Sequence, residues 1–411
     1  MYDLIVIGGG PSGMMAAGRA AELGKKVLLL EKNKSLGKKL KISGGGRCNI
    51  TNAEFELHQF LHAYGSAEPC LYSAFAQFGV QDTFTFFESH GLPLVVEARK
   101  RAFPQTQKAA DVCSTLEAYM KKGRVEVRTS APVTRIETNS EGLIAAVVVG
   151  GEVLRAHSFL LAVGGVSHPE TGSTGDGFAW LKKMGHTIHT PTPSVVPLAV
   201  KEEWSKELSG TSLSFMKITF FMDGKKQFAQ TGKILFTHFG LSGPLILNSA
   251  HKVADLLHSG LVTATIDAYP HTDLGALEKK IIHVFDANKN KELKNIIKEF
   301  VPDDTQKGIA LLLAQEMDIT KQVNSITKEE RKKIVHLLKA LPLTIVGLMG
   351  FDRAVVADGG VSLKEIDTRT MRSRKIPNLL VTGDLLNIHR PSGGFSLQLC
   401  WTTGYVAGTH A

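Results

Sequence analysis

The sequence of 411 residues has little that would suit a membrane-spanning or disulfide-stabilised protein. Only four cysteines are present, and no two of them have the short spacing of a zinc site or a disulfide framework. No run of about 18 apolar residues occurs, which excludes a transmembrane helix. The N-terminal stretch has no basic segment before its short apolar run, so we expect no signal peptide. These absences favour a protein of the reducing cytoplasm that binds no metal.

Acidic residues are also scarcer than basic ones, with 39 Asp and Glu against 48 Lys and Arg, a formal net charge of +9. The excess is concentrated between Lys25 and Arg47, where eight basic residues accompany one acid, Glu31. Such a patch attracts phosphate on a cofactor, a nucleotide or a nucleic acid, although a solvated lysine-rich face is commoner. Aromatic residues make up only 7%, and no RNA-recognition module is apparent. The charge therefore indicates affinity for anions without naming a partner.

The first thirty residues predict a βαβ unit that binds a nucleotide. A strand over Tyr2 to Ile7 precedes a helix of small residues, and Val27 to Leu30 forms a second strand. Between the first strand and the helix, Gly8-x-Gly10-x-x-Gly13 matches the dinucleotide fingerprint, whose glycines allow a tight turn, approach of a pyrophosphate and close helix packing. Glu31 ends the second strand, where a carboxylate can accept from a ribose hydroxyl. This favours an unphosphorylated adenosine, as in FAD or NAD.

Three later glycine clusters favour FAD over NAD. They are 43–49, then Gly164-Gly165 with the turn 171–177, and finally Gly383-Asp384 with 391–394. Each could be turn chemistry alone, but an extended cofactor needs several such turns whereas an NAD domain needs one. The helix after Gly394 would direct its N-terminal amides at a phosphate or an electron-rich ring. No second strand–GxGxxG–helix unit and no Cys-x-x-Cys pair is present, which excludes an enzyme of the disulfide-reductase kind.

The rest of the sequence predicts a second domain inserted into the first. Further short strands are expected over 125–127, 133–137, 143–149 and 159–163, and 213–222 alternates like an antiparallel strand. Residues 273–341 have helical periodicity, strand-like sequence returns over 344–361 and 379–382, and a terminal helix follows. We predict an α/β nucleotide-binding domain over 1–190 and 350–411. The inserted domain, 191–349, is expected to have a β part (about 191–271) and a helical part (about 272–342).

The segment Lys38-Lys39-Leu40-Lys41-Ile42-Ser43-Gly44-Gly45-Gly46-Arg47-Cys48-Asn49-Ile50-Thr51-Asn52 resembles the signature of the BaiN/RdsA-like flavoproteins, a group that includes aminoacetone-oxidase-like proteins. The resemblance continues through 101–104, 161–165, 171–177, 235–244, 383–384 and 391–398, so it spans almost the whole chain. It implies a two-part Rossmann-like FAD-binding domain with an inserted β-barrel-like and helical domain covering the flavin. It also implies reduction of a C=C bond conjugated to a carbonyl, on steroid-like acids or on uridine in ribosomal RNA, or amine oxidation.

At three places near the expected flavin the sequence departs from the family's usual residues. Asp384 stands where Glu is common, Phe395-Ser396 where Tyr-Asn is common, and His168 where an aromatic residue is common. We expect these positions to touch the cofactor or the substrate pocket, so the substrate of any one family member does not transfer directly.

The glycine patterns and the resemblance together predict the residues that bind FAD. They are Gly8, Gly10, Pro11, Ser12, Gly13, Glu31, Lys32, Lys39, Ser43, Gly45, Gly46, Arg47, Asn49, Thr51, Val133, Ala162, Gly164, Gly165, Gly172, Gly175, Asp176, Gly383, Asp384, Gly393, Gly394 and Phe395. For Arg47, a cofactor phosphate and a substrate anion are both open as partners.

Four residues are candidates for catalysis, because each lies in a glycine-bounded motif expected to face the flavin: Cys48, His238, His389 and Arg390. Burial in the core is the commoner role of a free cysteine such as Cys48. His238 could equally cap the helix after Pro244. For His389 and Arg390, which directly precede the Gly-Gly turn, contact with flavin or substrate is favoured, and a proton-transfer role has no separate support.

We therefore predict an FAD-dependent oxidoreductase that takes hydride from NADH or NADPH and reduces a C=C bond conjugated to a carbonyl, with uridine in 23S ribosomal RNA as one target. A flavin oxidase of a small amine or hydroxy acid is a second hypothesis. A flavin-containing RNA-binding factor with little turnover is a third. The expected partners are a small molecule or ribosomal RNA, with no membrane and no metal.

Overall fold

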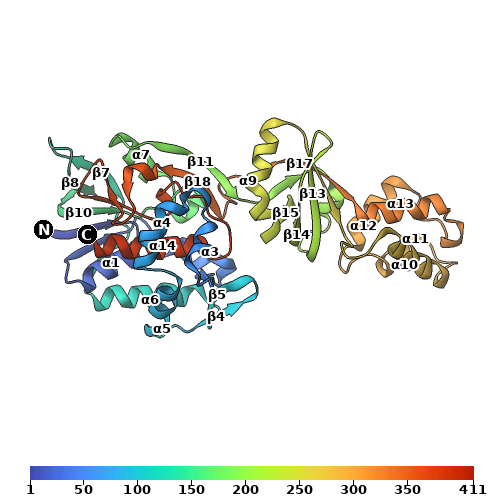
Figure 1. Cartoon of the computed structure of the whole chain (residues 1–411), viewed down its shortest axis with the longest axis horizontal. Helices are drawn as coiled ribbons and strands as arrows, with labels where there is room; N and C mark the ends of the chain where they lie inside the picture. The colour runs from blue at the N-terminus through green and yellow to red at the C-terminus, as the bar shows by residue number, and fades with distance from the viewer. The chain divides into compact units, whose positions relative to one another are not determined.

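The computed structural model describes residues 1–411. The chain divides into two compact units, the first formed by Met1–Pro193 together with Ala354–Ala411, and the second by Ser194–Arg353 (Figure 1). The first unit is thus made of both ends of the chain, and the second unit is a continuous segment.

The first unit is built on a seven-stranded sheet with the order β19-β20-β21-β10-β1-β2-β6. The strands are β1 (Tyr2–Ile7), β2 (Val27–Leu30), β6 (Glu126–Arg128), β10 (Ala156–Leu161), β19 (Ile366–Asp367), β20 (Arg372–Ser373) and β21 (Leu379–Val381). The neighbours from β21 through β6 are parallel, and the central strands are apolar and buried on both faces, as parallel strands covered by helices require. Since these strands point the same way, the glycine turns that follow β1, β10 and β21 lie at one edge of the sheet.

Two helices from opposite ends of the chain pack together beside this sheet. Figure 1 shows α14 (Phe395–Thr409) running alongside α1 (Pro11–Glu22). The contact needs glycine, because a Cβ on Gly404 would lie under 3.0 Å from the Ser12 carbonyl oxygen and a Cβ on Gly408 equally close to the Ala16 carbonyl oxygen. The glycines of α14 are therefore what allow it to approach the backbone of α1.

The remaining elements of the first unit surround the sheet. The helices are α2 (Lys38–Ile42), α3 (Leu57–His62), α4 (Glu68–Gln77), α5 (Val80–Ser89), α6 (Ala109–Lys122) and α7 (Asp176–Lys183). One small sheet has the order β3-β5-β4, with β3 (Thr51–Asn52), β5 (Arg101–Pro104) and β4 (Leu94–Glu97). A second contains β7 (Val133–Thr138), β8 (Ile144–Val149) and β9 (Glu152–Leu154), and β11 (Ile188–Val195) pairs with β18 (Val356–Val361). Helices α3 to α5 and the hairpin β4–β5 were not predicted from the sequence.

The second unit combines a closed barrel with a group of helices. The barrel has the order β12-β15-β14-β13-β16-β17, formed by β12 (Leu198–Val200), β13 (Ser212–Met222), β14 (Lys225–Thr237), β15 (Gly240–Ser242), β16 (Val262–Asp267) and β17 (Leu341–Leu348). Its helices are α8 (Glu203–Lys206), α9 (Pro244–Ser259), α10 (Leu274–Ala287), α11 (Leu293–Ile296), α12 (Gln306–Glu316) and α13 (Lys328–Lys339). The predicted fold class, a Rossmann-like α/β domain with an inserted barrel-like and helical part, is confirmed.

The strand-like stretch predicted over 344–361 is two strands in different sheets. β17 completes the barrel, whereas β18 pairs with β11 outside it. No helix in the chain has both the length and the apolar character needed to cross a membrane.

We expect Gly404→Ala to lower the free energy of unfolding by about 1–3 kcal/mol, because the new Cβ overlaps the backbone of α1 and the two helices must separate. Urea unfolding of the purified protein measures this loss. Gly347→Ala is the control, because a Cβ there meets nothing within 4 Å. Equal unfolding midpoints for both variants would show that the helix contact tolerates a side chain.

Candidate functional site

The turn from β1 into α1 leaves space for an anion. A Cβ on Gly8 would lie under 3.0 Å from the Ala162 carbonyl, and one on Gly13 would overlap the Gly8 carbonyl, whereas one on Gly10 would meet nothing within 4 Å. No side chain caps α1, and its first turn carries no acidic residue. The start of this helix therefore has no capping side chain and has space beside Gly10, which fits the pyrophosphate of FAD.

Glu31 holds the glycine turn as well as offering a place for a ribose. Its carboxylate is buried and accepts from the Gly9 backbone N–H at 2.7 Å, and from the backbone and side-chain amides of Asn33, also at 2.7 Å. A carboxylate has about four acceptor positions, so these three bonds leave one for a ribose hydroxyl. The binding of an adenosine ribose by Glu31 stays a prediction, and the structure adds a structural role for Glu31 that the sequence did not show.

The glycine loop after β10 is tied to the end of β2. Lys32 Nζ lies 2.7 Å from Asp176 Oδ2 and donates to Thr174 Oγ1 at 2.6 Å, and Gly172 lies against Asn33. Burial works to raise the pKa of Asp176, but its hydrogen bonds from Lys32 and Thr174 hold the pKa below its ordinary value. Lys32 and Asp176 therefore position one another, and they bring two predicted cofactor loops together.

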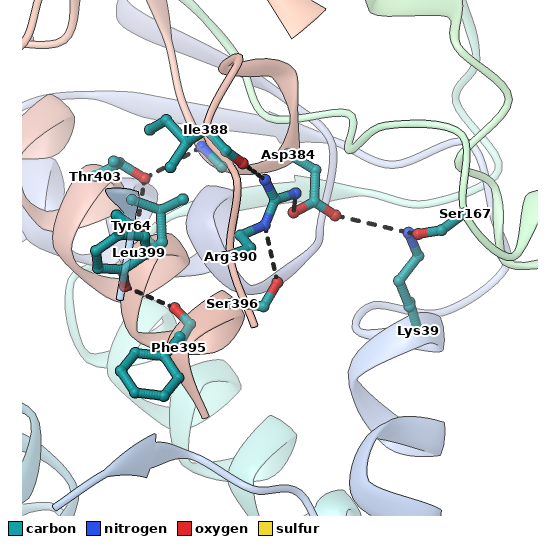
Figure 2. A network of polar contacts seen from close by, with 11 residues as sticks. Lys39, Tyr64, Ser167, Asp384, Ile388, Arg390, Phe395, Ser396, Leu399 and Thr403 are labelled. Atoms are coloured by element: carbon teal, nitrogen blue, oxygen red, sulfur yellow. Dashed lines mark hydrogen bonds and ion pairs between the residues drawn. The ribbon is translucent and has the colours of Figure 1, made fainter. Parts of the chain in front are cut away.

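A cluster of charged side chains around the buried Arg390 lies at the N-terminal end of α14 (Figure 2). The Arg390 side chain is only 1% exposed and donates to Asp384 Oδ1 at 2.6 Å, to the Ile388 carbonyl at 2.5 Å and to Ser396 Oγ at 3.2 Å. Lys39 Nζ, from α2, lies 3.9 Å from Asp384 Oδ2 and donates to Ser167 at 3.2 Å. The cluster connects the turn that follows β21 to α2 and to the loop after β10.

The charges of this cluster stabilise one another. Burial works to raise the pKa of Asp384, but the charges of Arg390 and Lys39 outweigh it, so the pKa lies below its ordinary value. Burial lowers the pKa of Lys39, and the negative charge of Asp384 offsets this only in part. The side chains of Asp384 and Lys39 keep 20% and 26% exposure, so these two groups, unlike Arg390, can still be reached by a bound molecule.

The Gly393-Gly394 turn packs directly on strand β3. A Cβ on Gly394 would overlap the Thr51 backbone. The Asn49 side-chain amide is oriented so that both its nitrogen and its oxygen have partners. The nitrogen donates to the Thr51 and Ala102 carbonyls at 3.1 Å, and the oxygen accepts from Gly394 N at 3.0 Å. The Phe395 ring lies 4.9 Å from Phe60, and the buried Tyr64 hydroxyl donates to the Phe395 carbonyl at 2.9 Å. The head of α14 is therefore rigidly placed.

A histidine–carboxylate pair lies just before this turn. His389 Nδ1 is 2.7 Å from Asp358 Oδ2, which belongs to β18. The His389 side chain is 38% exposed and that of Asp358 is 25% exposed. The pair is therefore an accessible, oriented imidazole close in sequence to the buried Arg390.

Comparison with known proteins matches this architecture to a family. The model of the HI0933-like protein Rossmann domain matches residues 2–410. The chain belongs to this family. Membership confirms the predicted family, the Rossmann-type fold and the predicted class, an FAD-dependent oxidoreductase.

Relatives of this HI0933-like chain carry two kinds of name. The 3-dehydro-bile acid delta(4,6)-reductase of Clostridium scindens is 28% identical over 416 residues, covering 100% of this chain and 99% of the relative. The ribosomal RNA dihydrouridine synthase of Escherichia coli is 27% identical, covering 98% and 96%. Among solved structures, 3-ketosteroid-delta4-(5alpha)-dehydrogenase from Rhodococcus jostii RHA1 superposes with a TM-score of 0.56 at 14% identity, covering 100% of this chain and 96% of that one, which is a likeness of fold.

Two residues of the segment 43–48 in this HI0933-like chain, Cys48 and Arg47, were predicted to act in catalysis and in anion binding, and both roles stay predictions. Cys48 is fully buried with a left-handed φ of 61°, and burial raises the pKa of its thiol to about 12, which favours packing over acid catalysis. Arg47 pairs with Glu97, donates to Gln107 at 2.6 Å and lies 4.1 Å from the Phe103 ring centroid. Its guanidinium thus already has protein partners, and neither anion proposed for it is favoured.

His238 lies in the second unit, between β14 and β15, with its ring 4.9 Å from that of Phe239. Helix α9 begins after Gly243 and has no side-chain cap, so the alternative role of His238 as a cap is not supported.

Of the other predicted residues, Val133 begins β7, Ala162 follows β10, and His168 has a left-handed backbone and lies 2.9 Å from Glu170. All the predicted FAD-binding residues belong to the first unit.

Sequence reasoning missed Asp358, Tyr64, Asn52 and Ser167. Asp358 precedes Gly359-Gly360, so an acid beside a glycine pair was a signal in the sequence. Tyr64 and Ser167 carry no such signal, because their partners, Phe395 and Lys39, are distant in the chain.

We expect Gly10→Ala to weaken FAD binding by at least about tenfold, because its Cβ would enter the open space ahead of α1. The apoprotein should lose less than about 1 kcal/mol of unfolding free energy. Titration of FAD by flavin fluorescence and urea unfolding of the apoprotein measure the two effects. Gly13→Ala, whose Cβ overlaps the Gly8 carbonyl, should destabilise the apoprotein itself. Wild-type FAD affinity in Gly10→Ala would contradict this placement of the cofactor.

We expect Asp384→Asn to cost about 3 kcal/mol of unfolding free energy at neutral pH, because it leaves Arg390 buried without a counter-charge. The folded-state pKa of Asp384 is below its unfolded value, so this stabilisation is present above about pH 4 and is lost as the pH falls through the folded-state pKa. Urea unfolding of wild type and variant at several pH values measures the difference, which should shrink below about pH 4. The double variant Asp384→Leu with Arg390→Met should recover most of the loss, and an equal or larger loss would show that the pair is not the cause.

Proposed function

We propose that this protein is a reductase that uses FAD and takes hydride from NADH or NADPH to saturate a C=C bond conjugated to a carbonyl. The observation that carries the proposal is the oriented, accessible His389–Asp358 pair beside the rigid, charge-stabilised head of α14. Reduction of such a bond needs a proton for one carbon and a hydrogen-bond donor for the carbonyl, and these groups offer both.

The names of two relatives support this reaction class. One is a reductase of delta(4,6) double bonds in a 3-dehydro-bile acid, and the other makes dihydrouridine, which differs from uridine by hydrogenation of a ring C=C bond beside a carbonyl. The two substrates differ greatly in size and charge, but the bond that is reduced is of the same kind. This chain matches both relatives to a similar degree, so the names support the reaction and not the substrate.

FAD, when bound, supplies hydride transfer between the nicotinamide and the substrate. Gly10, Ser12 and the other amides at the start of α1 would hold its pyrophosphate, and Glu31 its adenosine ribose. The chain contains one dinucleotide fingerprint, so NADH or NADPH would act as a transient co-substrate rather than a resident cofactor.

The residues at the head of α14 divide into supporting and reacting groups. Arg390 is almost fully buried and uses three of its N–H groups on protein acceptors, so it positions the turn and does not reach a substrate. Lys39 Nζ, whose side chain is 26% exposed, is the group of the cluster placed to donate to a substrate carbonyl. His389 is the proton donor, and Asp358, which accepts from Nδ1, holds the imidazole in its orientation.

The test is to reduce the FAD-loaded protein anaerobically with NADH or NADPH and then to offer three oxidants in separate reactions: oxygen, a small uncharged enone, and unmodified ribosomal RNA. Rapid reoxidation of the flavin by the enone or the RNA, with hydrogenated product, supports the reductase. Reoxidation by oxygen at a catalytic rate, with none by the enone or RNA, would replace the proposal by the oxidase hypothesis.

We expect His389→Gln to slow reoxidation by the enone about 100-fold or more, and Asp358→Asn to slow it about 10- to 100-fold, because proton delivery is lost or misdirected. Reduction of the flavin by NADH or NADPH should change little in either variant, since that half-reaction needs no proton from His389. Stopped-flow absorbance separates the two half-reactions. Glu68→Gln, which removes the carboxylate beside the exposed His58 and His62, is the control and should behave as wild type. Equal slowing of both half-reactions would indicate a disturbed site rather than lost proton transfer.

A further inference from the structure

Helix α6 ends in a turn that other helices of the first unit make with glycine. The turn is closed by two backbone hydrogen bonds around one left-handed residue. In α6 they run from Arg124 N to the Lys121 carbonyl and from Val125 N to the Met120 carbonyl, both at 3.0 Å, and Arg124 is the left-handed residue with φ 58°. Three other helices, α1, α5 and α7, end with the same pair of bonds, and their left-handed residues are Gly24, Gly91 and Gly185. Of these four helices, only α6 has a side chain at that position.

Arginine is strained at this position, because its Cβ crowds the following carbonyl oxygen whereas glycine has no Cβ. A glycine does stand one position earlier, where the backbone is right-handed: Gly123 has φ −76°. Gly123 serves packing, since a Cβ there would lie 2.7 Å from Ala21 Cβ of α1. The helix packing therefore accounts for Gly123 and leaves Arg124 unexplained. A residue kept in a strained backbone is a candidate for a function of its side chain.

Arg124 lines a cavity of about 550 Å³ between α6 and β6, at the margin of the first unit where Figure 1 shows α6. Four of the other lining residues are apolar. Leu36 and Met120 are buried, while Val125 is half-buried and Val127 is 38% exposed. A partly apolar recess of this volume is of the size that holds one small molecule.

The cavity has more positive than negative charge. Lys121 and Arg124 are exposed, and the side chain of neither makes a hydrogen bond or an ion pair within the protein. Glu117 is the acid among the lining residues, and its Oε1 accepts from the Cys113 thiol at 3.3 Å. Two cations against one carboxylate favour a ligand with a single anionic group over a nucleotide with several phosphates.

The cavity is separate from the predicted cofactor site. None of its lining residues is among those predicted to bind FAD. Leu36 packs against the glycine turn, because a Cβ added to Gly9 would lie 2.4 Å from Leu36 Cδ2. The Glu31 carboxylate is directed to Gly9 N and to the amides of Asn33. The apolar Leu36 side chain therefore lies between the fingerprint turn and the cavity.

We propose that this cavity binds a small molecule with an apolar body and one anionic group. Leu36, Met120 and the two valines contact the apolar body, and Lys121 and Arg124 bind the anion. A guanidinium binds a carboxylate or sulfonate through two parallel N–H bonds, which accounts for an arginine at a position that favours glycine. Binding there is independent of the flavin reaction and adds a second site to the first unit.

The probe is anilinonaphthalenesulfonate, which has an apolar aromatic body and one sulfonate and fluoresces in an apolar site, titrated into the FAD-loaded protein. We expect Arg124→Gly to weaken its binding about tenfold, because a charged partner of the sulfonate is lost. The same variant should unfold about 1–2 °C higher, because the strain is removed. Lys121→Gln should weaken the probe by a similar factor without the gain in stability. Uncharged phenylnaphthylamine should bind both variants as it binds the wild type.

Two matched controls separate the cavity from charge and strain in general. Arg99 is also an exposed arginine with a left-handed backbone, φ 61°, but it does not line the cavity, so Arg99→Gly should raise the unfolding temperature and leave the affinity for the probe unchanged. Lys122 is exposed beside Lys121 and outside the lining, so Lys122→Gln should bind the probe as wild type. Val127→Ser should weaken both probes about threefold, because it removes apolar surface and no charge.

Equal affinity of the wild type, Arg124→Gly and Lys121→Gln for the anionic probe would overturn the proposed site. An effect of these variants that is seen in the apoprotein and disappears in the FAD-loaded protein would assign the cavity to the cofactor and overturn a separate site as well. A wild-type protein that binds the probe through Lys121 and Arg124 but reduces no enone and no RNA would refute the reductase alone.

Discussion

The structure of the first unit depends on the close approach of one helix, α14, to two backbones from the other end of the chain. At Gly394, Gly404 and Gly408 a single added carbon would overlap Thr51, Ser12 or Ala16. Because the backbones touch there, with no room for one more methyl group, the turn that follows β21 is held beside the first glycine turn. The predicted cofactor loops, 8–13 and 383–394, lie side by side only because this contact is made.

The buried charge cluster follows from that placement. With α14 packed in place, the Arg390 guanidinium is buried, and each of its buried N–H groups needs a hydrogen-bond acceptor. The Asp384 carboxylate, the Ile388 carbonyl and the Ser396 hydroxyl are these acceptors. Asp384 in turn is kept ionised by Arg390 and by Lys39 from α2. The cluster therefore fixes the direction in which the chain leaves β21 and the position of His389, so stability and the proposed function depend on the same residues.

Much of the fold could be predicted because its signals are local. The apolar runs of β1 and β2, the small residues of α1, the alternation of β13 and the periodicity of α10 to α13 each occupy one short window of sequence. Helices α3 to α5 were missed because their stabilising partners are remote: Phe78 stacks on Tyr405 and Phe87 packs against Trp401, both from α14. An aromatic residue in a short segment does not show whether a helix more than three hundred positions away will cover it.

By itself, the sequence determined the nucleotide fold and the class of cofactor. A glycine fingerprint between a strand and a helix requires one local backbone geometry, a tight turn that a pyrophosphate can approach closely. The tertiary structure alone decided which side chains meet. Asp358 orients His389, Lys39 reaches Asp384, and Asn52 joins Arg99 to Gly393, across separations that no spacing rule covers. The physical reason is that a hydrogen bond or ion pair depends on distance in space, which the order of the strands and the docking of α14 set. Sequence separation carries no information about it.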